Sequence, residues 1–186
     1  MDDWLNKIKT AEVLVVDLDG TLVNSDQANF LAYQAALLEV TGENLPMPVR
    51  PEERFNRNKL QQVMCDQPVQ IINAVVQRKE AIYSQFLHTT QLHNRLHQLL
   101  LACEDKVLVL ATHARQVRAQ QLLQQHNLQY LFAECYYYNA AQPNKYQQIF
   151  TRFKGKKILI FENEQEQAVH ALAAGADLDS IIMVGT

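Results

Sequence analysis

The sequence has few of the residues that mark specialised protein classes. Its three cysteines, Cys65, Cys103 and Cys135, are widely spaced and form no CxxC pair, which favours reduced thiols over a disulfide framework or a zinc site. No apolar run approaches the roughly 20 residues of a membrane-spanning helix. Residues 1–11 resemble neither a signal peptide nor a transit peptide. We therefore expect a cytoplasmic protein with no membrane partner.

Charge of neither sign dominates. Lys and Arg number 17 and Asp and Glu number 20, so the formal net charge of the 186 residues is -3. Such a balance gives no reason to expect a nucleic acid or an anionic membrane as partner. The hydrophobic fraction of 48% is ordinary for a globular protein, and the length suits one buried core with a small accessory domain. Nothing in the composition indicates an oligomeric state.

The most informative stretch is an apolar run that ends in two acids. The run from Val13 to Val16 is rich in β-branched residues, which is typical of a strand buried on both faces of a parallel sheet. Asp17 and Asp19 follow it, so in an extended chain both carboxylates leave on the same side, and Gly20 permits a sharp turn behind them. Ligands bind at this end of the strands in α/β sheets. A solvated turn is the alternative, because Asp and Gly are common in turns.

Apolar runs and amphipathic patterns alternate along most of the chain. Further strands are expected at residues 107–111, 135–138, 157–161 and 181–184. With helices between them, they predict an α/β fold with a doubly wound, five-stranded parallel sheet. The exception is a block of predicted helices, among them 26–40 and 52–64, with no strand between them. We expect an α/β core formed by residues 1–25 and 89–186, and a small all-helical domain formed by residues 26–88.

The apolar strand continues into a longer pattern, DLDGTLVNS, from Asp17 to Ser25. It resembles the first motif of the haloacid dehalogenase-like (HAD) superfamily, in the phosphatase and phosphoglucomutase-like branch that carries a helical cap after this motif. The resemblance implies a Rossmann-like core, with Asp17 as nucleophile and Asp19 as general acid/base. It also implies Mg²⁺ as cofactor and a small phosphorylated metabolite as substrate.

Chemistry alone gives the two acids suitable roles. A carboxylate that attacks a phosphate ester meets an anion, so a divalent cation must neutralise the approach. Asp17 could bind that cation with one oxygen and attack with the other. Asp19 could protonate the leaving group and later deprotonate the water that hydrolyses the aspartyl-phosphate.

Two further positions resemble the second and third motifs of the family. Thr112 ends an apolar run, where its hydroxyl could bond a phosphoryl oxygen, although capping the next helix would also explain a Thr there. Lys145 begins the helix before the fourth predicted strand and could offset the repulsion between the acids and a phosphate. A surface lysine is the alternative.

The fourth motif departs from the family pattern. The predicted metal ligands are Asp17, Asp19, Glu162 and Asn163, but the family has Asp where this chain has Asn163, and an amide oxygen brings no charge. Glu166, one turn later, could compensate, or Asn163 could simply cap a helix, with capping-box-like spacing to Glu166. Two functions therefore compete. One is a Mg²⁺-dependent phosphatase or phosphotransferase, and the other is a catalytically impaired HAD-fold binding protein with a degraded metal site.

Overall fold

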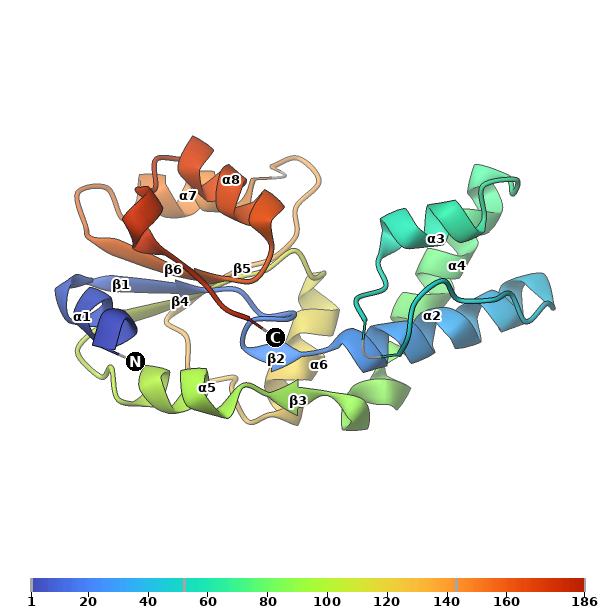
Figure 1. Cartoon of the computed structure of the whole chain (residues 1–186), viewed down its shortest axis with the longest axis horizontal. Coiled ribbons are helices and arrows are strands. Elements are labelled where there is room, and N and C mark those ends of the chain that lie inside the picture. The colour runs from blue at the N-terminus through green and yellow to red at the C-terminus, as the bar shows by residue number, and fades with distance from the viewer. Residues whose placement is uncertain (1, 52, 143, 186) are drawn as a thin grey trace. The chain divides into compact units, whose positions relative to one another are not determined.

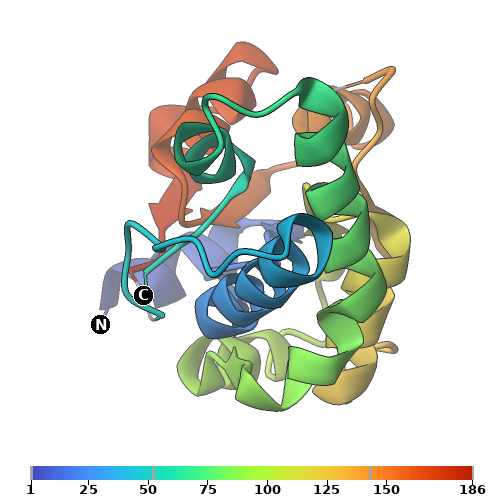
Figure 2. The same cartoon turned by 90° about the vertical axis from the view of Figure 1, so that its right-hand side faces the viewer.

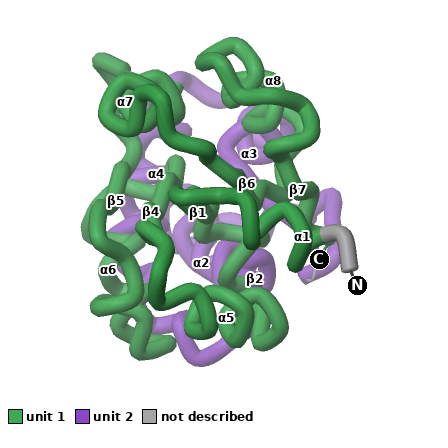
Figure 3. The backbone as a smooth tube through the Cα atoms, turned by 90° about the vertical axis from the view of Figure 1, so that its left-hand side faces the viewer, with its two compact units in different colours: residues 1–23, 92–186 green, residues 24–91 purple. Residues whose placement is uncertain are grey.

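The computed structural model describes residues 2–51, 53–142 and 144–185. The chain divides into two compact units (Figure 3): an α/β unit, residues 1–23 and 92–186, and a helical unit, residues 24–91. Two short strands, β2 (Val23–Asn24) and β3 (Gln91–Leu92), stand where the chain passes from one unit to the other, and they pair with each other. None of the described helices combines the length and apolar character that a membrane span requires.

The α/β unit is built on a five-stranded parallel sheet, as the alternation of apolar runs predicted. In spatial order its strands are β5 (Glu134–Tyr136), β4 (Val107–Ala111), β1 (Val13–Val16), β6 (Ile158–Glu162) and β7 (Ile181–Met183). Val16 is in register with Leu110 of β4 and with Phe161 of β6. The residues that follow β1 therefore emerge between the ends of its two neighbours.

Helices cover both faces of this sheet (Figures 1 and 3). On one face lie α7 (Lys145–Arg152) and α8 (Gln165–Ala173), and on the other lie α1 (Asp2–Thr10), α5 (Asn94–Leu101) and α6 (Gln116–Gln125). Alternate strand residues point to opposite faces. Ile160 accordingly packs in a buried cluster with Ile149 of α7, while the next residue, Phe161, meets the ring of Trp4 in α1, with centroids 5.7 Å apart.

The helical unit has a core of its own, formed by α2 (Asp26–Thr41), α3 (Arg57–Val63), α4 (Val69–Ile82) and the 3-10 segment η1 (Tyr83–Thr89). Figure 2 shows α2 (blue) beside α4 (green). Phe30, Leu37, Leu60 and Val75 are among the buried side chains that these helices share. Burying each such side chain contributes about 1.5–3 kcal/mol. These buried side chains hold the helices of this unit together.

The second predicted helix begins later than expected. We expected a helix over residues 52–64, but α3 starts at Arg57; residue 52 itself lies outside the described residues. Asn56 is the N-cap, and its side chain accepts a hydrogen bond of 3.1 Å from the backbone N–H of Lys59. An Asn that satisfies a first-turn N–H marks the start of a helix more strongly than the preceding Pro51 does.

Candidate active site

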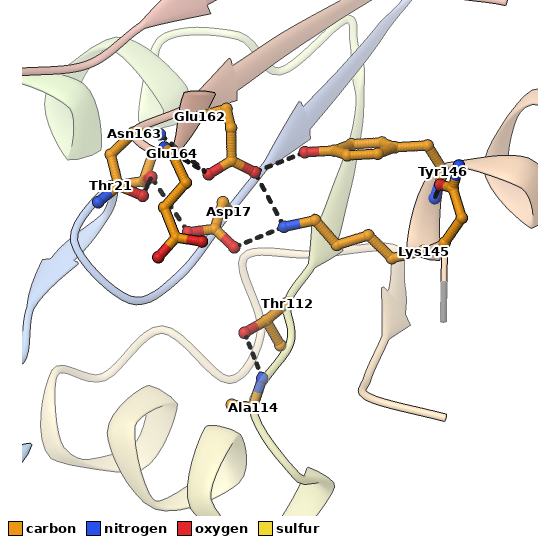
Figure 4. A network of polar contacts seen from close by, with 10 residues as sticks. Asp17, Thr21, Thr112, Ala114, Lys145, Tyr146, Glu162, Asn163 and Glu164 are labelled. Carbon is orange, nitrogen blue, oxygen red and sulfur yellow. Dashed lines mark hydrogen bonds and ion pairs between the residues drawn. The ribbon is translucent and has the colours of Figure 1, made fainter. Parts of the chain in front are cut away.

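Polar side chains from three neighbouring strands gather at the carboxyl edge of the sheet (Figure 4). Asp17 follows β1, Thr112 follows β4 and Glu162 is the last residue of β6. Their exposed fractions are 6%, 1% and 0%, so all three are buried. The backbone N–H of Asp17 donates to the carbonyl of Phe161 at 3.0 Å, which ties the start of the loop to β6. The expectation that β1 lies between the strands ending at Thr112 and Glu162 is confirmed.

Lys145 connects the carboxylates of Asp17 and Glu162. Its Nζ donates to Asp17 Oδ1 at 2.7 Å and to Glu162 Oε2 at 2.9 Å (Figure 4). The Lys145 side chain is 2% exposed, so the surface-lysine interpretation is wrong. The hydroxyl of Tyr146 also donates to Glu162 Oε2, at 2.6 Å. One ammonium and one phenol thus hold two buried carboxylates in place.

The second oxygen of Glu162 is also engaged. Glu162 Oε1 accepts backbone N–H groups from Asn163 at 3.0 Å and from Glu164 at 3.2 Å. Both oxygens of this carboxylate therefore have protein donors. Such an acid acts first as a fixed counter-charge for Lys145.

Burial and mutual charge set the protonation of this group. Burial raises the pKa of Asp17 to about 7, and the Glu162 charge adds to the rise while Lys145 opposes it. Burial also disfavours the charged forms of Lys145 and Glu162. The charges of Asp17 and Glu162 outweigh burial and raise the pKa of Lys145, and the charge of Lys145 together with the hydrogen bonds to Glu162 lowers the pKa of Glu162. Lys145 and Glu162 are thus the charged partners, and Asp17 is the acid whose charge responds most readily to a nearby cation.

A second cluster of oxygens surrounds Thr21. Its hydroxyl oxygen lies 3.1 Å from Asp17 Oδ2 and 3.1 Å from Asn163 Oδ1 (Figure 4). A hydroxyl has one hydrogen and can donate it to only one of these two acceptors at a time. A carboxylate, an amide and a hydroxyl oxygen therefore share a single hydrogen, and hard cations such as Mg²⁺ take oxygens of these kinds as ligands. The donor set fits the implied metal.

The charge of that donor set is low. In the part of the chain that the structure describes, no three His, Cys, Asp or Glu side chains form a group that could hold a metal. Glu166 is exposed on α8, whereas the buried side chain in that turn is Gln167, at 5% exposure. Gln167 Oε1 has no hydrogen-bond partner among the described groups. An ion at this edge would thus gain no charge from a buried acid in the first turn of α8.

Asn163 does not cap α8. The N-cap residue is Glu164, and the Asn163 side chain accepts from Thr21 instead. The capping interpretation of Asn163 is therefore wrong. Gln167, a buried amide in the first turn of α8, was missed by the sequence reasoning, and no local pattern marked it.

Thr112 does not cap a helix either. The N-cap of α6 is Arg115, three residues later, and the Thr112 hydroxyl accepts the backbone N–H of Ala114 at 3.0 Å (Figure 4). That bond uses a lone pair of the hydroxyl oxygen and leaves its hydrogen for donation. Thr112 can thus present a donor at the buried edge of the sheet.

Asp19 has a cationic partner that the sequence did not suggest. Arg118 in the first turn of α6 donates from Nη1 to Asp19 Oδ1 at 2.8 Å. The side chains of Arg118 and Asp19 are 14% and 8% exposed, so the pair is largely shielded from water. The structure thus joins Asp17, Lys145, Glu162 and Asn163 through one set of hydrogen bonds and holds Asp19 with Arg118. The only sequence signal for Arg118 was its position in the helix that follows Thr112.

Solved structures share this fold at low sequence identity. A HAD-superfamily hydrolase of subfamily IA from Geobacter sulfurreducens has a TM-score of 0.67 and 16% identity, over 90% of this chain and 85% of its own. A predicted phosphoglycolate phosphatase from Haemophilus somnus has 0.73 and 21%, over 95% and 85%. CbbY from Rhodobacter sphaeroides, solved in complex with phosphate, has 0.72 and 14%, over 95% and 87%.

These likenesses show that the chain has the HAD-like fold, with a Rossmann-like core and a helical cap domain. No protein-family model and no curated protein matches the sequence. The fold is thus established by structure. The chemistry depends on the residues at the carboxyl edge of the sheet.

Proposed function

We propose that this protein is a HAD-like phosphatase or phosphotransferase that acts on a small phosphorylated metabolite through an aspartyl-phosphate on Asp17. The observation that carries the proposal is the Lys145 ammonium, which bridges the buried carboxylates of Asp17 and Glu162. Two buried acids and a phosphate would repel one another without such a cation. A carboxylate between an ammonium and a cluster of metal-type oxygens is well placed to attack a phosphoryl group.

The residues divide the reaction between them. An oxygen of Asp17 forms a bond to phosphorus as the bond to the leaving oxygen breaks, and Asp19 delivers the proton that this oxygen needs. The Thr112 hydroxyl donates to a phosphoryl oxygen, and Lys145 offsets the charge that gathers there. Asp19 then takes a proton from the water that hydrolyses the aspartyl-phosphate.

Mg²⁺ would be held by Asp17 and Asn163. Of the other two ligands predicted from the sequence, Glu162 has protein donors on both carboxylate oxygens, and Asp19 is assigned to proton transfer. When bound, it supplies the positive charge that lets a carboxylate approach a phosphate dianion. The oxygen cluster around Thr21 supports this assignment because its two acceptors, Asp17 Oδ2 and Asn163 Oδ1, share the single hydrogen of the Thr21 hydroxyl.

A second candidate function is binding without efficient turnover. Its support is Asn163, which supplies an uncharged oxygen where the family has a carboxylate. A protein of this kind would bind phosphate at the same edge, with Mg²⁺ affinity too weak to support catalysis. Metal affinity separates the two candidates.

The experiment that tests the proposal is the turnover of aryl and alkyl phosphates by the wild-type protein and by Asp17→Asn, each with and without Mg²⁺. We expect Asp17→Asn to lower Mg²⁺-dependent turnover by roughly a thousandfold or more, since the nucleophile is gone. Asp179→Asn is the matched control, because Asp179 is an exposed acid of the same unit and should keep wild-type turnover. Unchanged turnover by Asp17→Asn would exclude this nucleophile.

A further inference from the structure

The contact between Arg118 and Asp19 joins residues that are 99 positions apart in the sequence. Arg118 lies in the first turn of α6, directly before the buried Ala119, and α6 is anchored further along by Leu122 and Leu123. The guanidinium therefore extends from a helix that is fixed to the body of the α/β unit. A hydrogen-bond donor carried by a fixed helix can restrict the side chain that accepts from it.

The backbone of Asp19 is restricted independently. Gly20 has φ of 84° and donates to the carbonyl of Val23 at 2.8 Å, and the N–H of Leu22 donates back to Leu18 at 3.1 Å. A β-bridge also links Asp19 to Val23. This turn restricts the backbone of Asp19, and the hydrogen bond from Arg118 acts on the rotation of its side chain.

We propose that Arg118 is a positioning residue for Asp19: it fixes the side chain by binding Oδ1, so that Oδ2 exchanges the proton with the leaving group and then with water. This inference rests on the proposed function of Asp19 as general acid/base. An arginine can only donate hydrogen bonds, so the oxygen that it binds is the poorer site for a transferable proton. Proton transfer needs the donor atom within hydrogen-bond reach of the leaving oxygen.

If Arg118 positions Asp19, its loss should slow phosphoryl transfer most for substrates whose leaving group needs a proton. An alkoxide leaves with a proton, so hydrolysis of an alkyl phosphate depends on a correctly placed Asp19. A nitrophenolate leaves without one, so transfer of the phosphoryl group from an aryl phosphate to Asp17 depends on Asp19 much less, whereas the later hydrolysis of the aspartyl-phosphate is the same for both substrates. A merely structural Arg118 would affect both substrates alike.

The test compares Arg118→Met with Asp19→Asn and with the double variant on glycerol phosphate and p-nitrophenyl phosphate. Arg118→Met removes the guanidinium but keeps an unbranched side chain. We expect kcat/KM, which reports the transfer to Asp17, to fall about 100-fold for the alkyl phosphate and less than about tenfold for the aryl phosphate. The double variant should be no slower than Asp19→Asn, because both changes act on one step.

Arg115→Met is the matched control. Arg115 precedes the same helix, is exposed and makes no side-chain capping bond, so both activities should stay at the wild-type level. Equal losses of kcat/KM on both substrates in Arg118→Met, or additive losses in the double variant, would overturn the positioning role. A crystal structure of Arg118→Met gives a readout that needs no activity: we expect Asp19 in a new rotamer, and an unchanged Asp19 refutes the proposal. A failure of Asp17→Asn to alter turnover would instead count against the proposed nucleophile.

Discussion

Restoring a carboxylate at position 163 is the most direct test of the metal site. Asn163 Oδ1 and Asp17 Oδ2 each lie 3.1 Å from the same Thr21 hydroxyl oxygen, so an acid at position 163 would place a second charge beside Asp17. Two unit charges 4 Å apart interact by about 4 kcal/mol at an effective dielectric constant near 20. Without a metal the two carboxylates repel each other, whereas a bound cation is attracted to both.

We therefore expect Asn163→Asp to bind Mg²⁺ more tightly by roughly one to two orders of magnitude, since part of the Coulomb gain is lost to desolvation of the new charge. Calorimetric titration with MgCl2 measures the affinity. Thermal unfolding gives a second readout: the melting temperature of the variant should fall below wild type without Mg²⁺ and rise more steeply when Mg²⁺ is added.

Gln165→Glu is the control for this experiment. It adds one negative charge to the start of the same helix at an exposed position, and it should leave Mg²⁺ affinity within about twofold of wild type. An unchanged affinity in Asn163→Asp would refute the reasoning and place Asn163 outside any metal site. A tighter metal site without turnover would favour the binding-protein candidate.

Three further substitutions probe the rest of the site. Lys145→Met leaves Asp17 and Glu162 buried without their shared cation, and should lower the free energy of unfolding by about 3–5 kcal/mol in urea denaturation. Tyr146→Phe removes one of the donors to Glu162 and should cost about 1–3 kcal/mol in the same assay; no change would mean that the phenol is not a stabilising donor. Thr112→Val should lower kcat for both aryl and alkyl phosphates by about 100-fold, if its hydroxyl donates to the phosphoryl group, and wild-type kinetics would contradict that role.

Much of the fold could be predicted from the sequence because the signals are local. Apolar runs bounded by turn residues marked the strands of the sheet, and their alternation with helices predicted its parallel order. The acids after the first run marked the edge where a site would form. Each of these inferences depends on neighbouring residues alone, which is why they did not require coordinates.

The contacts within the site depended on tertiary structure. Lys145 meets Asp17 across 128 positions and Thr21 meets Asn163 across 142, and such contacts depend on sheet register and side-chain rotamers that no local pattern specifies. Asn163 shows the difference, since an Asn there suits a helix N-cap and a metal ligand equally well in sequence. The structure decides between them: the N-cap position of α8 is Glu164, one residue later, and the Asn163 side chain accepts from the Thr21 hydroxyl, a contact that only the tertiary structure brings about.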